Sequence, residues 1–153
     1  MKFVIPAIAF LAVSSLLVTG CSATARQNGT YIEEQGYSYR YIAFITDDAV
    51  QKISTVLPPA KTQIRLSSPA ELDPRDYFGK NLMEGLRQHG FSATTGTPDE
   101  DSSFLPLTYA LSNLDKNPGK FHVVINIGSM QFTRLYSANA GKIVPASVWS
   151  VRR

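Results

Sequence analysis

The feature that most constrains this chain is its single cysteine, Cys21, which follows a short apolar run and a glycine. Met1 and Lys2 form a minimal positive start, and Phe3 to Val18 is almost wholly apolar. This arrangement is typical of a secretory signal peptide rather than of a folded element. The run is also shorter than the roughly 20 residues that a membrane-spanning helix needs. Removing the first 20 of the 153 residues leaves 133, enough for about one domain with one core.

The residues that lead into the cysteine resemble a bacterial lipoprotein signal, with Cys21 preceded by Leu17, Val18, Thr19 and Gly20. In such signals the peptidase cuts before the cysteine, and the thiol carries the lipid. The resemblance implies lipid attachment at Cys21 and signal recognition through the four residues before it. An ordinary thiol beside an uncleaved anchor helix is the alternative. A leftover thiol would be a liability in an exported protein, and lipidation would consume this one.

The resemblance to a lipoprotein signal also implies in which membrane the protein is anchored. Ser22 stands where an Asp usually signals retention at the inner membrane. We therefore expect a lipid-anchored protein on the periplasmic face of the outer membrane. Several acyl chains would hold it firmly, since each buried methylene contributes roughly 0.8 kcal/mol.

The predicted organisation has three parts. Residues 1–20 are a signal peptide, residues 21–36 a lipid-anchored flexible tether, and residues 37–153 a globular domain. The tether prediction rests on the small and polar composition of the segment up to Gly36.

Three alternating tyrosines, Tyr37, Tyr39 and Tyr41, open the predicted domain, with Ile42 and Phe44 on the opposite parity. This alternation predicts an extended segment with two usable faces. Two interpretations stay open. The tyrosines either form a first strand of the domain's own sheet or contact a partner, because aromatic ladders suit both roles.

A first helix is predicted after Thr46, which can cap it, with Asp47 and Asp48 in the first turn. Its apolar face consists of Ala49, Ile53, Val56 and Leu57. The Pro58–Pro59 pair ends it, because proline forbids helical continuation. Alternation over residues 62–66 then predicts a short strand.

A second helix has the clearest signals. Asp73 is its predicted cap, Pro74 its first residue, and Asp76 lies in the first turn. The apolar face repeats through Phe78, Leu82, Met83 and Leu86. Gly90 is predicted to end this helix, and Phe91 to pack back on it and open a short strand.

Alternating runs predict further strands over residues 105–111, 121–127, 130–136 and 142–151. Gly128-Ser129 suits a tight hairpin turn, and Pro145 argues for an edge strand or a bulge. The predicted fold is a compact α+β domain with two helices packed on one face of a mostly antiparallel sheet.

The net charge of the chain is small and points to no particular class of partner. The formal net charge is +3, too mild to argue for nucleic acid, and we expect no direct contact with it. Residues 102–153 hold one acid and six bases, namely Asp115 against Lys116, Lys120, Arg134, Lys142, Arg152 and Arg153. This excess fits a solvated sheet face, or a contact with an acidic partner or lipid headgroups.

Residues that carry chemistry are sparse. His89 and His122 have no neighbouring ligand at metal-binding spacing, so no metal site is expected. No nucleophile elbow, phosphate loop or dinucleotide motif occurs. The acidic run Asp99–Asp101 fits a solvated loop. We therefore predict no enzyme, no catalytic residues and no cofactor other than the covalent lipid on Cys21.

Several segments, in this order and spacing, resemble the TrbH family of conjugal transfer lipoproteins: Leu57–Thr62, Phe78–Leu82, Leu86–Phe91, Leu105–Tyr109, Phe132–Tyr136, Val144–Ala146 and Trp149. Each motif is modest, but together they cover nearly the whole chain. The departures are Phe91 where Tyr is usual, and Ser147-Val148 where small residues are usual.

The resemblance implies a structural lipoprotein of a conjugative type IV secretion system for plasmid DNA transfer. It implies a place in a ring-shaped hetero-oligomer at the outer membrane, with TrbG-like and TrbI-like core subunits as partners. A general envelope lipoprotein that binds a periplasmic protein or the cell wall is the alternative. A lipid-anchored enzyme is the third hypothesis.

Overall fold

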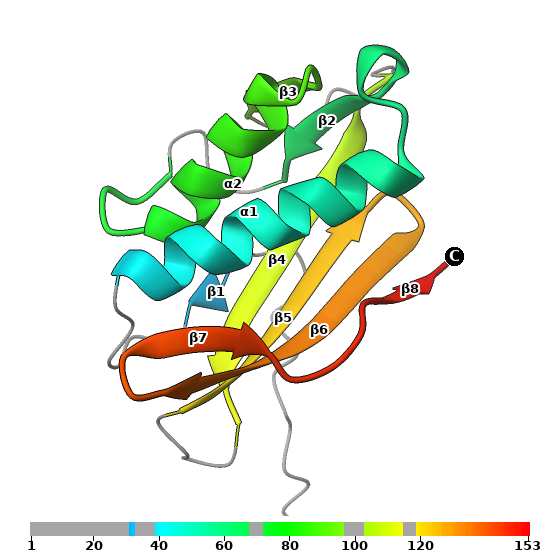
Figure 1. Ribbon diagram of the computed structural model, residues 1–153. Helices are drawn as coiled ribbons and strands as arrows, with labels where there is room; N and C mark the ends of the chain where they lie inside the picture. The colour runs from blue at the N-terminus through cyan, green and yellow to red at the C-terminus, as the bar shows by residue number, and fades with distance from the viewer. Residues whose placement is uncertain (1–30, 33–38, 68–71, 97–102, 115–118) are drawn as a thin grey trace, which may run out of the picture.

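The computed structural model describes residues 31–32, 39–67, 72–96, 103–114 and 119–153 (Figure 1). The predicted signal, the lipid site at Cys21 and the first of the three tyrosines, Tyr37, lie outside the described residues. Most of the predicted tether lies outside them too.

Eight strands form one sheet in the described part of the chain. The strand order is β3-β2-β4-β5-β6-β7, with β1 beside β4 and β8 beside β6. The pairs β1–β4, β2–β3 and β2–β4 are parallel. All pairs among β4 to β8 are antiparallel. The strands are β1 (Tyr31–Ile32), β2 (Gln63–Leu66), β3 (Ser92–Thr95), β4 (Leu105–Asn113), β5 (Lys120–Ile127), β6 (Met130–Asn139), β7 (Lys142–Pro145) and β8 (Ser150–Arg152).

Two helices, α1 (Tyr39–Val56) and α2 (Tyr77–Gln88), cover one face of this sheet, and a short 3-10 turn, η1 (Pro59–Lys61), follows α1 (Figure 1). The helices are needed as crossovers, because parallel strands such as β2 and β3 cannot be joined by a tight turn. The predicted α+β domain with two helices on a mostly antiparallel sheet is confirmed.

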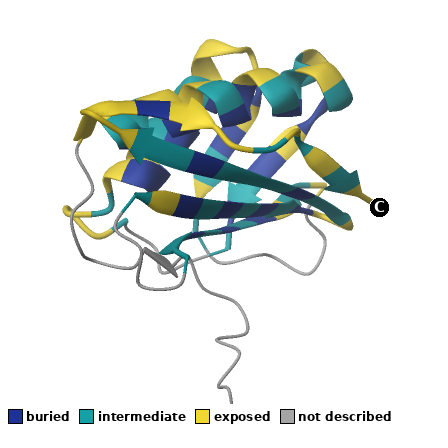
Figure 2. Cartoon of the chain, turned by 60° about the horizontal axis from the view of Figure 1, so that its bottom comes forward, coloured by how far each residue is buried: buried dark blue, intermediate teal, exposed yellow. Residues whose placement is uncertain are grey.

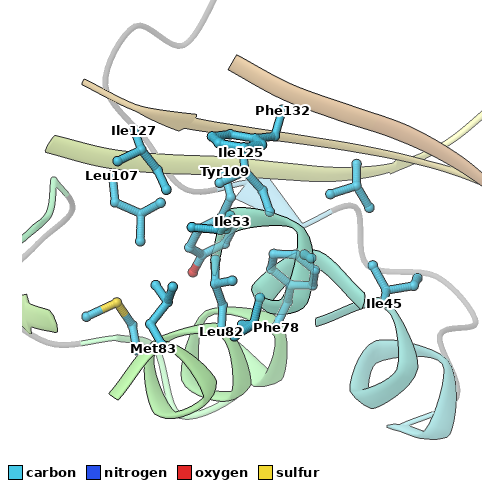
Figure 3. Close-up of a cluster of buried hydrophobic side chains, with 14 of the residues drawn as sticks. Ile45, Ile53, Phe78, Leu82, Met83, Leu107, Tyr109, Ile125, Ile127 and Phe132 are labelled. Atoms are coloured by element: carbon cyan, nitrogen blue, oxygen red, sulfur yellow. The ribbon is translucent and has the colours of Figure 1, made fainter. Parts of the chain in front are cut away.

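The core lies between the helices and the sheet. Ile53 of α1 and Leu82 of α2 are fully buried against Tyr109, Ile125 and Phe132 of the sheet (Figure 3). Every second residue of β5 is buried, and the banding along the strands in Figure 2 follows this alternation. The predicted apolar faces of both helices therefore point into one common core.

The start of α1 differs from the prediction. Residues from Tyr39 onward are helical, not extended, and Thr46 lies inside the helix rather than at its cap. Its buried hydroxyl donates to the carbonyl of Ile42 at 2.9 Å. Ile42, Ile45 and Ala49 extend the helical apolar face upstream, so burial on the sheet decides over the short tyrosine alternation.

The cap of α2 also differs. Asp76, not Asp73, is the N-cap, and its side chain accepts from the Gly79 amide at 2.7 Å. The Asp73 carboxylate instead accepts from the Arg75 amide at 2.8 Å, in the turn before the helix. Two acids three residues apart offered two capping positions, and the structure uses the second.

Glycine ends α2 as predicted. Gly90 has φ 87°, a left-handed conformation that suits glycine. The Phe91 amide donates to the Leu86 carbonyl at 3.0 Å, which closes the helix end and buries the phenyl ring.

The last predicted strand is divided. Residues 142–151 form β7 and β8, which pair with different parts of β6. The connecting residues stay on the β6 edge, because the Ala146 amide donates to the Leu135 carbonyl at 2.8 Å. The Leu135 amide donates to the Ser147 hydroxyl at 2.9 Å. Pro145 ends β7, in keeping with the predicted irregularity at that residue.

Candidate interaction surfaces

A partly buried polar cluster joins three separate parts of the chain. Asp48 of α1 accepts from Arg134 Nη1 at 2.7 and 2.9 Å, from the Tyr136 hydroxyl at 2.5 Å, and from Trp149 Nε1 at 3.2 Å. Arg134 and Tyr136 belong to β6, and Trp149 directly precedes β8. We call these four residues the Asp48 cluster.

The Asp48 cluster is closed on itself. Arg134 Nε donates to the Ser147 carbonyl at 2.9 Å, and the guanidinium lies 5.6 Å from the centroid of the Trp149 ring. Burial, and then the hydrogen bond to Asp48, raise the pKa of the Tyr136 hydroxyl above its usual range, so it remains a donor. Because the carboxylate accepts from these internal donors, the cluster holds α1 on β6 and on the segment before β8.

A second polar contact fixes the start of α2. The Tyr109 hydroxyl of β4 donates to Oδ2 of the Asp76 carboxylate. The other oxygen of this carboxylate, Oδ1, caps the helix. A Cβ atom at Gly79 would overlap this tyrosine hydroxyl. Glycine at position 79 thus allows a strand tyrosine to reach the helix cap.

A shallow groove of about 250 Å³ lies between the two helices. Gly85 lets the helices approach closely, because a Cβ there would lie 2.9 Å from Val50 Cγ2. Asp47 and Glu84 are the two carboxylates in the lining, each accepting from a glutamine one turn further on. The lining residues are Ala43, Thr46, Asp47, Val50, Asn81, Glu84, Gly85, Gln88 and His89.

The other face of the sheet carries no helix in the described part of the chain (Figure 1). On this face the side chains of β4, β5 and β6 are half-buried, except for the exposed Pro106, Lys120 and Asn139 near the strand ends. We call the half-buried ones the open sheet face: Thr108, Ala110, Ser112, His122, Val124, Asn126, Gln131, Thr133, Leu135 and Ser137.

Charge on the strands is one-sided. The eight described strands contain no Asp or Glu and five Lys or Arg residues. One base, Arg134, belongs to the Asp48 cluster. The four others share the parity of the open sheet face, as their strand partners Pro106, Ser137, Asn139 and Gln131 show: Arg65, Lys120, Lys142 and Arg152.

The two predicted contact tyrosines that the structure describes occupy different environments. Tyr39 is 60% exposed at the start of α1, and its ring packs edge-on against Tyr77 of α2 at 5.7 Å. Tyr41 is half-buried and lies 6.0 Å from the ring of Phe121. The helix therefore separates side chains that an extended segment would have placed on one face.

Sequence patterns did not predict the Asp48 cluster, but one signal for it was present. Arg134 has the same strand parity as Phe132 and Tyr136, both fully buried. A charge on the core side of a strand requires a partner, because an unpaired buried charge is costly. The partner could not be read from spacing, since Asp48 lies 86 residues away.

The described residues contain neither a metal-binding cluster nor a helix that could cross a membrane. No three side chains among their His, Cys, Asp and Glu residues lie close enough together to hold a metal ion. His89 Nδ1 lies 3.0 Å from the Gly85 carbonyl at the end of α2, and His122 lies on the open sheet face. None of the described helices is long and apolar enough to cross a membrane.

Fold and surfaces together define a small α+β domain whose polar clusters tie its own elements together. In the described part of the chain, helices cover only one face of its sheet. The chain matches the family of the conjugal transfer protein TrbH over residues 24–153, and it therefore belongs to that family. No curated protein and no solved structure gives a match. The family resemblance inferred from the sequence is confirmed.

Proposed function

We propose that this protein is a lipid-anchored structural component of a conjugative type IV secretion system, which stabilises the outer-membrane core complex. The observation that carries the proposal is the match to a conjugal transfer family over residues 24–153. The lipoprotein-like segment ends at Cys21, and the matched region begins at residue 24. A lipid at Cys21 would hold the domain at a membrane, close to other subunits.

The contacts of the described domain support a structural rather than a catalytic role. Asp48 and Asp76 are engaged by internal donors from the sheet and the helix start. General acid–base catalysis needs a group within reach of a substrate proton. These carboxylates instead join helix to strand, which suits an assembly component.

Partner contact near the tether is part of the proposal. Tyr39 is exposed beside Tyr77 at the end of α1 nearest the tether. Tyrosine is enriched at binding hot spots, and tethering raises the effective concentration of a neighbouring partner. Tyr37 and Tyr41 flank this residue in the sequence, and the TrbG-like and TrbI-like core subunits are the proposed partners.

Cys21→Ser tests the anchor. We expect the variant to lose palmitate labelling, to accumulate as an unprocessed precursor, and to reduce plasmid transfer from the donor sharply. Ser22→Ala is the matched control and should keep both labelling and transfer. Equal labelling of wild type and Cys21→Ser would rule out lipidation at this residue.

Membrane fractionation tests the proposed location at the outer membrane. Ser22→Asp should move the labelled protein to the inner-membrane fraction, whereas the wild type stays with the outer membrane. A wild-type protein found in the inner-membrane fraction would contradict the proposed location. Full plasmid transfer from a donor that lacks the gene would contradict the proposed function itself.

A further inference from the structure

The centre of the open sheet face holds no charged side chain of Lys, Arg, Asp or Glu. Strand register places Ala110 beside Val124, and Val124 beside Thr133, in one row across β4, β5 and β6. The next row toward the β4 start is Thr108, Asn126 and Gln131, which are joined by hydrogen bonds of 3.0 Å. No Lys, Arg, Asp or Glu stands in either row of these three strands.

Basic side chains surround this neutral centre at both ends of the strands. Lys120 and Lys142 pair with Ser137 and Asn139 near the end of β6. Arg152 pairs with Gln131 near the start of β6. At the same end as Arg152 stands Arg65 of β2, whose guanidinium lies 4.5 Å from the centroid of the Phe104 ring.

Protein interfaces commonly have this composition, with charged residues depleted at the centre and present at the rim. We propose that the open sheet face docks a protein surface of the transfer machinery that has a neutral centre and carboxylates at its rim. The inference rests on the proposed function, because the partner is sought among the proteins of that machinery. Opposite charges at the rim would steer the encounter and fix its register.

Other occupants fit this face less well. A second copy of the chain bound face to face would oppose Lys120, Lys142 and Arg152 with like charges, which costs free energy. Single-stranded nucleic acid binds through aromatic side chains on which successive bases stack, and the open sheet face has no Phe, Tyr or Trp. Attachment to anionic lipid favours basic residues beside inserted aromatic or leucine side chains, whereas here the bases stand at two opposite ends.

Site-specific photo-crosslinking in donor cells tests the proposal with the full chain. The crosslinking residue replaces Thr133 at the centre of the open sheet face or, as a control, the exposed Gln51 on α1. We expect Thr133 alone to capture a protein encoded by the transfer region, through a peptide that contains Asp or Glu. Capture of lipid, of nucleic acid, of the same chain or of nothing at Thr133 would overturn the proposal.

Charge reversal then tests the basic rim. Lys120→Glu with Arg152→Glu should lower the crosslink yield at Thr133 at least about tenfold, the equivalent of about 1.4 kcal/mol. Lys52→Glu with Lys61→Glu makes the same change of charge on the helical layer and should leave the yield unchanged. Both double variants must melt like the wild type, since all four side chains lie at the surface or partly exposed. Equal yields from the two double variants would show that the rim does not matter.

Replacement of the captured partner's carboxylates by lysine should restore the crosslink yield of the Lys120→Glu/Arg152→Glu variant.

Plasmid transfer distinguishes failure of the proposed function from failure of the proposed docking surface. If deletion of the gene leaves transfer intact, the proposed function is wrong, whatever Thr133 captures. If the deletion abolishes transfer but Thr133 captures no protein of the machinery, only the proposed docking surface is wrong.

Discussion

The two faces of one sheet carry different kinds of side chain on the same three strands. On the helix side, Tyr109, Ile125 and Phe132 are at most 1% exposed. One residue along each strand, Thr108, Asn126 and Gln131 are half-buried and hydrogen-bond to one another. The helix-covered face therefore determines stability, because burial of apolar surface dominates folding. The open sheet face has no helix over it in the described part of the chain, and its half-buried side chains are mostly polar or small.

Core truncation on the helix side should have the largest effect. Leu82→Ala and Leu86→Ala each remove a fully buried side chain of α2. Each should lower the free energy of unfolding by about 2–5 kcal/mol, since a cavity adds to the lost burial. Chemical denaturation of the domain measures this.

The exposed Glu84 of the same helix supplies the control, because Glu84→Ala should change stability by less than about 0.5 kcal/mol. If both leucine variants unfolded at the wild-type denaturant concentration, the helix-covered face would not determine stability as described.

The Asp48 cluster is the polar part of the helix-covered side, and its loss should have the next largest effect. Asp48→Ala leaves the Arg134 guanidinium, the Tyr136 hydroxyl and the Trp149 indole without their shared acceptor. We expect a loss of about 2–4 kcal/mol, because partly buried donors and a charge lose their partner.

Asp47→Ala is the matched control on the adjacent residue. Asp47 is exposed and accepts a single 3.3 Å bond from Gln51, so its removal should change stability by about 0.5 kcal/mol or less. Equal losses for Asp47→Ala and Asp48→Ala would mean that general charge on α1, not the cluster, stabilises the fold.

Most of the sheet was predictable because its alternation is long and regular. The runs that became β4, β5 and β6 each showed a period of two, and turn residues stood between them. Gly128 adopts positive φ at the predicted hairpin turn, and Gly141 does so at the next turn along the chain. Local chemistry was enough in these regions.

Predictions failed where distant contacts decide. The helix α1 begins at Tyr39 because Ile42 and Ile45 bury against the sheet, a contact that three alternating tyrosines do not reveal. The Asp48–Trp149 bond joins residues 101 positions apart, so no spacing in the sequence indicates it. Only the parity of Arg134 pointed toward such a partner.

Titration of the Tyr136 hydroxyl should have the smallest of these effects on stability. Burial beside Asp48 raises the pKa of the Tyr136 hydroxyl above its ordinary value of 10.0. Above pH 10 the unfolded chain therefore loses the Tyr136 proton first, and deprotonation favours the unfolded state. The stabilisation is fully present below pH 10 and falls as the pH rises beyond it.

The Tyr136→Phe variant has no hydroxyl to titrate at this position. The stability difference between wild type and this variant should therefore shrink by about 1.4 kcal/mol from pH 9 to pH 11. Tyr39→Phe changes a tyrosine that is 60% exposed, and its difference from wild type should stay constant over the same range. A constant difference for Tyr136→Phe as well would show that the helix-covered face does not hold this hydroxyl in its protonated form.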